Sequence, residues 1–183
     1  MVRSSSPWIM LALCALPAVC GCDAAAKAPA ASAAAKPVEL KITDFRGIMD
    51  TVASHRGKVV VMDAWSTQCA PCMQEFPKLV ALHHTYPEQV ACISLSMDFE
   101  GLGKPEDQRT KVLEFLTRQH ATFDNLLSSE PSDDLYAKFK LPSIPAVFVY
   151  DQQGQLAERF DSTRGKPFTY KDVEERVVKL LGK

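Results

Sequence analysis

Residues 65–77 read WSTQCAPCMQEFP, and the rest of the sequence is best understood from this segment. It carries a pair of cysteines, Cys69 and Cys72, that are separated by two residues. An apolar run at residues 59–62 precedes the pair and is typical of a strand that is buried on both faces. Apolar residues at helical spacing follow, over about residues 71–86. The cysteine pair is therefore predicted at the junction of a buried strand and a helix.

Three kinds of site can contain two cysteines at this spacing. A structural disulfide would close a loop of only a few residues, which constrains the unfolded chain very little. A zinc site needs four ligands, but the sequence has neither a second C-x-x-C nor a suitably spaced histidine pair. His83 and His84 are adjacent on the predicted helix and point about 100° apart, so we expect no metal here. A redox-active pair is the favoured interpretation.

The start of a helix supplies the reactivity that a redox pair needs. The free backbone N–H groups and the dipole at this end favour a thiolate on Cys69. Cys69 would attack a target disulfide, and Cys72, one turn further along, would resolve the mixed disulfide. Pro71 is compatible with the first turn, because an N–H there has no partner in any case. We expect the Cys69–Cys72 pair to work without another cofactor.

Apolar periodicity predicts strands that alternate with helices, followed by a hairpin and a closing helix. This order favours an α/β domain with a mixed central sheet. The expected strands are residues 38–42, 59–62, 90–96, 122–127, 146–150 and 156–160. The expected helices are about residues 44–54, 71–86, 106–120, 133–139 and 170–181.

The segment at residues 65–77 resembles the active site of thioredoxin-fold proteins. Its Glu-Phe-Pro after the second cysteine is similar to the TlpA/ResA-like branch of exported thiol–disulfide oxidoreductases, which is related to the AhpC/TSA proteins. The resemblance covers about residues 38–183 and implies a thioredoxin-like fold with a helical and strand insertion at about residues 100–127. Residues 141–146, LPSIPA, resemble the cis-proline loop of the family. Gln68 departs from the family, which usually has Trp directly before the first cysteine.

Two acids are candidates for tuning the cysteines. Asp63 interrupts the buried strand six residues before Cys69, and burial should raise its pKa. The resemblance implies that Asp63 accepts the proton of Cys72; the alternative is a partly hydrated residue at the strand end. Glu75 lies three residues after Cys72, on the same helix face. The resemblance implies that Glu75 tunes the cysteine pKa values, and the alternative is an acid that the helix dipole favours.

The resemblance also implies a substrate groove beside Pro145, which we expect to follow a cis peptide bond rather than a plain trans turn. The cis bond would hold Ile144 extended, so that its backbone N–H and C=O could pair with a substrate strand. Trp65 and Gln68 are expected to contribute to substrate binding as well. Cys92 falls in a predicted core strand and is expected to be an inert buried thiol.

The N-terminus is typical of an export signal. An apolar run at residues 8–19 is too short to span a bilayer and fits the core of a secretory signal. The Val-Cys-Gly-Cys that ends at Cys22 resembles a bacterial lipobox, so we expect residues 1–21 to be a lipoprotein signal peptide and Cys22 to be lipidated. Cys20 is a second candidate for the lipid, and an ordinary cleaved signal is the alternative. Residues 22–37 then form a tether, rich in alanine and without aromatic or branched side chains.

The composition limits the choice of partners. The 183 residues include 21 basic and 22 acidic side chains, and this near-neutral balance gives no field for holding nucleic acid. We expect a monomer on the periplasmic side of a membrane, anchored through Cys22. The family resemblance implies thiol–disulfide exchange with exported protein disulfides or an apocytochrome c-like substrate. It also implies that the protein acts as a reductant and is recharged by a membrane thiol donor.

Other function classes fit the sequence less well. Thr67 lies two residues before Cys69, which is one residue short of the Thr-x-x-Cys of a peroxiredoxin-like thiol peroxidase. A copper-handling lipoprotein of thioredoxin fold has a wider C-x3-C with a companion histidine, whereas the spacing here is C-x2-C. A non-catalytic adaptor would not need an intact cysteine pair. The sequence thus favours a thiol–disulfide oxidoreductase.

Overall fold

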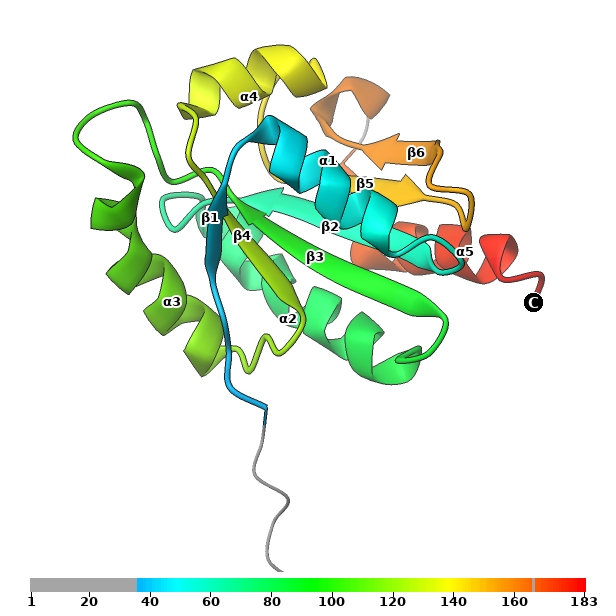
Figure 1. Cartoon of the computed structure of the whole chain (residues 1–183). Helices are drawn as coiled ribbons and strands as arrows, with labels where there is room; N and C mark the ends of the chain where they lie inside the picture. The colour runs from blue at the N-terminus through cyan, green and yellow to red at the C-terminus, as the bar shows by residue number, and fades with distance from the viewer. Residues whose placement is uncertain (1–35, 166) are drawn as a thin grey trace, which may run out of the picture. The chain divides into compact units, whose positions relative to one another are not determined.

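A mixed β-sheet forms the centre of the domain in a computed structural model, which describes residues 36–165 and 167–183 (Figure 1). In this part of the chain six strands have the order β1-β4-β3-β2-β5-β6. Neighbouring strands from β1 to β2 are parallel, while β5 is antiparallel to both β2 and β6. The strands are β1 (Lys41–Thr43), β2 (Val59–Trp65), β3 (Val90–Ser96), β4 (Asp124–Ser128), β5 (Ala146–Tyr150) and β6 (Leu156–Phe160).

Helices cover both faces of the sheet, as Figure 1 shows. The apolar side chains of α2, α3 and α5 pack in one core cluster, and we call this side of the sheet the α2 face. Those of α1 and α4 pack in a second cluster on the opposite side, the α1 face. The helices are α1 (Phe45–Ser54), α2 (Ala70–Thr85), α3 (Arg109–Arg118), α4 (Ser132–Phe139) and α5 (Tyr170–Leu180), with 3-10 turns at Pro105–Gln108 and Ser162–Arg164.

Strand β2 lies in the middle of the sheet, and all seven of its residues are buried. Because successive side chains of a strand point to opposite faces, Val61 and Trp65 enter the cluster with α2, while Val60 and Met62 enter the one with α1. Asp63 stands between Val61 and Trp65 in the series that points to the α2 face. The side chain of Asp63 therefore points to the face of the sheet that α2 covers.

The sequence predicted the order of elements correctly. The observed boundaries of strands and helices differ from the predicted ones where strand pairing or helix capping determines them. The Asp44 side chain accepts a hydrogen bond from the Gly47 N–H at 2.9 Å and caps α1, as expected. The strand expected at residues 38–42 is only β1, because its pairing with β4 begins at Lys41. The helix expected at residues 106–120 is a 3-10 turn followed by α3.

The insertion expected at about residues 100–127 supplies α3 and β4. Strand β4 is parallel to both β3 and β1 and separates them in the sheet. Helix α3 brings Val112, Phe115 and Leu116 into the cluster on the α2 face. The insertion thus extends the sheet by one strand and one covering helix.

The predicted lipidation site lies outside the described residues, as do the predicted signal peptide at 1–21 and most of the tether at 22–37. Among the described helices, none has the length and apolar character needed to cross a membrane.

Candidate active site

The cysteine pair lies where β2 passes into α2, as the sequence predicted. Cys69 and Cys72 form a disulfide, with their Cα atoms 5.2 Å apart. Cys69 is the N-cap of α2 and is partly exposed, whereas Cys72 is only 2% exposed. An incoming thiol or disulfide can therefore approach the first sulfur but not the second.

The first turn of α2 is arranged around the Cys69 sulfur. The Cys72 N–H points to Cys69 Sγ, with a nitrogen–sulfur distance of 3.3 Å. Pro71 occupies the first turn, where its missing N–H leaves no gap in the helix bonding. A thiolate on Cys69 would meet this N–H and the positive end of the helix dipole, and both lower the free energy of the anion.

Asp98 holds the loop that leads to Cys69, and the sequence reasoning missed it. This buried carboxylate follows β3 and accepts hydrogen bonds from the Thr67 N–H, at 3.1 Å to each oxygen, and from the Thr67 hydroxyl. It also accepts a hydrogen bond from Ser96 Oγ at 2.7 Å and pairs with Lys111 Nζ at 3.1 Å. Its position just after a predicted strand was a usable signal, because the carboxyl ends of neighbouring parallel strands meet at one edge.

Trp65 does not fit the predicted role in substrate contact. Its side chain is fully buried, so no partner at the surface can touch it. The indole packs against Phe76 of α2 and Phe115 of α3, with ring centroids 5.1 and 4.7 Å away. This side chain points into the α2 face because of its place in β2, and the prediction from sequence did not use that alternation. Trp65 supports α2 from below.

Asp63 is buried, as the sequence predicted, and burial raises its pKa to about 7. Its Oδ2 accepts a hydrogen bond from the hydroxyl of Tyr170, which acts against that increase. The charge of Glu75 raises the pKa of Asp63 further. Its Oδ1 has no hydrogen-bond partner among the described residues. A carboxyl group of this kind can exchange a proton near neutral pH.

Glu75 lies one turn after Cys72 and forms an ion pair with Lys78 at 2.8 Å. Its negative charge contributes to the raised pKa of Asp63. A direct effect of Glu75 on the cysteines stays a prediction.

The loop before β5 lies beside the cysteine pair. The peptide bond between Ile144 and Pro145 is cis, which confirms the prediction for this bond. Ile144 and Gln68 both line a surface groove that reaches Cys69, and Gln68 is exposed. We call it the Cys69 groove; its lining residues are Ser66, Gln68, Cys69, Met97, Glu100, Ser132, Asp133, Tyr136 and Ile144.

Cys92 is the free cysteine of the described chain, and it is buried in β3. Its Sγ donates a hydrogen bond to the carbonyl oxygen of Leu79, with a sulfur–oxygen distance of 3.7 Å. Burial is the main reason that the pKa of this thiol is raised well above its ordinary value. Both observations agree with the expectation of an inert core thiol.

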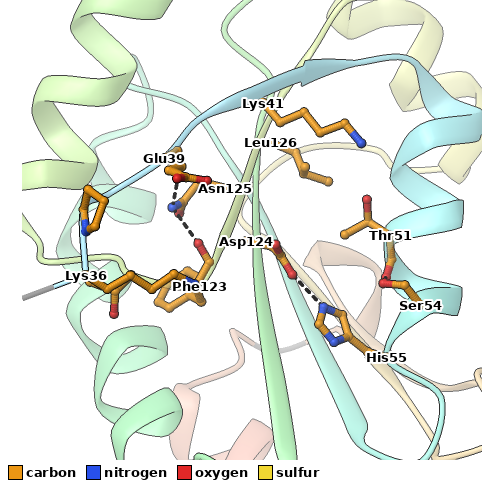
Figure 2. Close-up of a pocket in the computed structure, with 12 residues that line it drawn as sticks. Lys36, Glu39, Lys41, Thr51, Ser54, His55, Phe123, Asp124, Asn125 and Leu126 are labelled. Carbon is orange, nitrogen blue, oxygen red and sulfur yellow. Dashed lines mark hydrogen bonds and ion pairs between the residues drawn. The ribbon is translucent and has the colours of Figure 1, made fainter.

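A second hollow lies at the other end of the parallel strands, where β4 begins. Figure 2 shows that His55, Asp124 and Asn125, three of its polar side chains, bond to each other or to the backbone. His55 Nε2 lies 2.6 Å from Asp124 Oδ2, and Asn125 donates to the carbonyl oxygens of Glu39 and Phe123 at 3.1 and 2.9 Å. No cysteine lines it. Across the described residues, no three side chains among His, Cys, Asp and Glu come together as a metal site.

Residues 57–156 match the family model described as thioredoxin-like. The chain belongs to the thioredoxin-like family. It is 24% identical to the thioredoxin-like protein YneN of Bacillus subtilis, over 76% of this chain and 75% of YneN. It is also 24% identical to the thiol-disulfide oxidoreductase ResA of Geobacillus kaustophilus, over 76% of this chain and 72% of ResA.

Solved structures of similar fold agree with this assignment. A secreted disulfide oxidoreductase of Mycobacterium tuberculosis superposes with a TM-score of 0.54 at 20% identity, covering 69% of this chain and 85% of that one. The expected thioredoxin-like fold is thus confirmed. With the Cys69–Cys72 disulfide and relatives of this name, this member of the thioredoxin-like family is a thiol–disulfide oxidoreductase.

The raised pKa of Asp63 predicts how stability depends on pH. Between the ordinary value of 3.8 and the folded value of about 7, the folded protein keeps a proton that the unfolded chain has released. The stability that this bound proton contributes to the folded state is therefore fully present below about pH 4, and it is lost as the pH rises to about 7. Asp63→Asn removes the titration, so its stability relative to wild type should grow by about 4 kcal/mol between pH 4 and pH 8.

Urea unfolding of the oxidised proteins at the two pH values measures this difference. The control is Asp134→Asn, an exposed acid on α4, for which the difference from wild type should stay within about 0.5 kcal/mol. If the difference in unfolding free energy between Asp63→Asn and wild type does not change with pH, the raised pKa of Asp63 is contradicted.

Proposed function

We propose that the protein reduces disulfide bonds of exported proteins, such as an apocytochrome c, outside the cytoplasm, where Cys22 tethers it to a membrane. The observation that carries this proposal is the disulfide at the start of α2, with an accessible first sulfur and a buried second one. That asymmetry separates the attacking thiol from the resolving thiol. The lipobox-like sequence supports the location and the tether.

The reaction is a transfer of two electrons from the reduced pair to a substrate disulfide. The Cys69 thiolate attacks one substrate sulfur, the substrate S–S bond breaks, and one substrate thiolate leaves. Cys72 then loses its proton and attacks Cys69 Sγ in the mixed disulfide. The Cys69–Cys72 bond forms and the second substrate thiolate departs, so both substrate sulfurs end reduced. A membrane thiol donor would restore the dithiol.

Asp63 is our candidate for the group that takes the Cys72 proton. It lies on the α2 face of the sheet, within the electrostatic influence of Glu75 in the first turns of α2. Its pKa of about 7 lets it accept a proton at neutral pH and release it again. Cys72 itself is too buried to give its proton directly to bulk water.

The Cys69 groove is our candidate for the substrate-binding surface. Ile144 lines it beside the cis peptide bond, where its backbone could pair with an extended substrate segment. Gln68, in place of the usual Trp, gives this rim a polar amide. The groove could hold a substrate strand with its sulfur above Cys69.

The structure offers no support for the peroxidase alternative. The Thr67 hydroxyl donates its hydrogen bond to Asp98, which lies after β3. Its one O–H donor is therefore used in anchoring the loop to Asp98 and is not directed at Cys69.

Cysteine variants test the two roles. Cys69→Ser should abolish insulin-disulfide reduction by the reduced protein, because the accessible nucleophile is gone. Cys72→Ser should accumulate a mixed disulfide through Cys69, which mass spectrometry detects. Cys92→Ser is the control and should keep wild-type exchange, since that thiol is sealed in the core. Exchange that persists without Cys69 would refute the attacking role.

The reduction potential tests the direction of electron flow. Equilibration of the Cys69–Cys72 couple in a series of glutathione redox buffers gives the midpoint. A reductant of exported disulfides should have a midpoint more negative than about −230 mV, in the range of reducing thioredoxin-type couples. A midpoint near about −120 mV would instead make the protein an oxidant.

A further inference from the structure

Helix α5 begins at Tyr170, which is buried in the core cluster on the α2 face. A capping box fixes this start, since the Thr169 N–H donates to Asp172 Oδ2 at 2.7 Å. Tyr170 is 5% exposed, and its hydroxyl donates to Asp63 Oδ2 from 107 residues away in the chain. The end of one helix is thus tied to the central strand under α2.

This hydrogen bond makes the two carboxylate oxygens of Asp63 different. Oδ2 is occupied by the Tyr170 hydroxyl, whereas Oδ1 has no partner in the described part of the chain. Oδ1 is therefore the carboxylate oxygen at which an arriving proton meets no competing hydrogen bond among the described residues. The hydroxyl also fixes the carboxylate plane, because an Asp side chain with one anchored oxygen loses its free rotation.

We propose that Tyr170 is a positioning residue for thiol–disulfide exchange: its hydroxyl holds Asp63 so that Oδ1 receives the proton of Cys72. This inference rests on the proposed role of Asp63 as the proton acceptor. In this proposal Tyr170 acts through the carboxylate, to which its hydroxyl donates. When Cys72 gives its proton to Oδ1, the new thiolate attacks Cys69 Sγ and the electron pair of the broken bond leaves with the substrate sulfur.

The groups around Asp63 determine in which direction its pKa should change when the Tyr170 hydroxyl is removed. Burial raises the pKa of Asp63, the hydrogen bond from Tyr170 lowers it, and the Glu75 charge raises it. Cys92 on β3 is a further titratable group that interacts with Asp63, and burial keeps its thiol protonated. Tyr170 also stays protonated, because burial raises its pKa well above 10, so it serves as a donor throughout. Loss of the hydroxyl should leave Asp63 protonated to a higher pH.

The test is the pH profile of the resolving step in the full chain with Tyr170→Phe. Reduced protein reacts with dithiobis(nitrobenzoate) in two phases: attack by Cys69 releases one thionitrobenzoate, and resolution by Cys72 releases the second. The midpoint of the second phase should rise by about one pH unit in the variant, while its rate at high pH matches wild type. Tyr150→Phe is the matched control, a buried tyrosine on the α1 face, and should leave the midpoint unchanged.

The pH profile of Tyr170→Phe distinguishes a positioning role of Tyr170 from a structural one. An unchanged midpoint in Tyr170→Phe overturns the proposal, and so does an equal loss of rate at every pH, which would indicate a structural role. If Tyr170→Phe fails to fold, fluorotyrosine at position 170, a stronger donor, should move the midpoint downward, and no movement again refutes the proposal. A wild-type second phase that Asp63→Asn leaves untouched refutes the proposed function of Asp63 instead.

Discussion

A sulfur anion at Cys69 needs the positive end of α2, and much of the surrounding structure serves to keep that end in place. The Cys72 N–H already points to Cys69 Sγ in the oxidised protein, so no rearrangement of the first turn is needed when the pair is reduced. Asp98 fixes the loop before Cys69 to β3 and α3. From below, Trp65 and Phe76 pack edge to face and hold α2 on the central strand. Reactivity and rigidity thus have the same structural origin.

The acid chemistry depends on a different constraint, the burial of a charge. Asp63 occupies a position in β2 whose neighbours on the same face, Val61 and Trp65, belong to the core cluster. Burying a carboxylate there opposes folding at neutral pH, and the Tyr170 hydrogen bond offsets only part of that cost. An aliphatic residue would fit the strand better. A role in proton transfer near the sulfurs explains why an acid occupies this position. Burial gives the carboxyl a pKa of about 7, whereas a solvent-exposed Asp would not titrate near that pH.

Local patterns predicted much of this site, and long-range contacts account for the rest. The run at 59–62, the C-x-x-C and the Gly-free helix that follows specify β2 and α2 because each depends on nearby residues. Pro145 was identifiable because few residue types adopt a cis bond. Asp98 and Tyr170 were missed as site residues, because their partners lie 31 and 107 residues away in sequence. Trp65 points into the core because side chains alternate along β2. The family resemblance alone gave no information about this orientation.

The ionisation of the Cys69 thiol shows directly whether the first turn of α2 makes this sulfur reactive. Alkylation of the reduced protein by iodoacetamide over a range of pH, with modification followed at Cys69 by mass spectrometry, gives the pKa of that group. If the first turn of α2 stabilises the thiolate, the midpoint should lie at least about one unit below the value of about 8.5 for free cysteine. A Cys69 thiol that ionises like free cysteine would show instead that the first turn of α2 does not stabilise the thiolate.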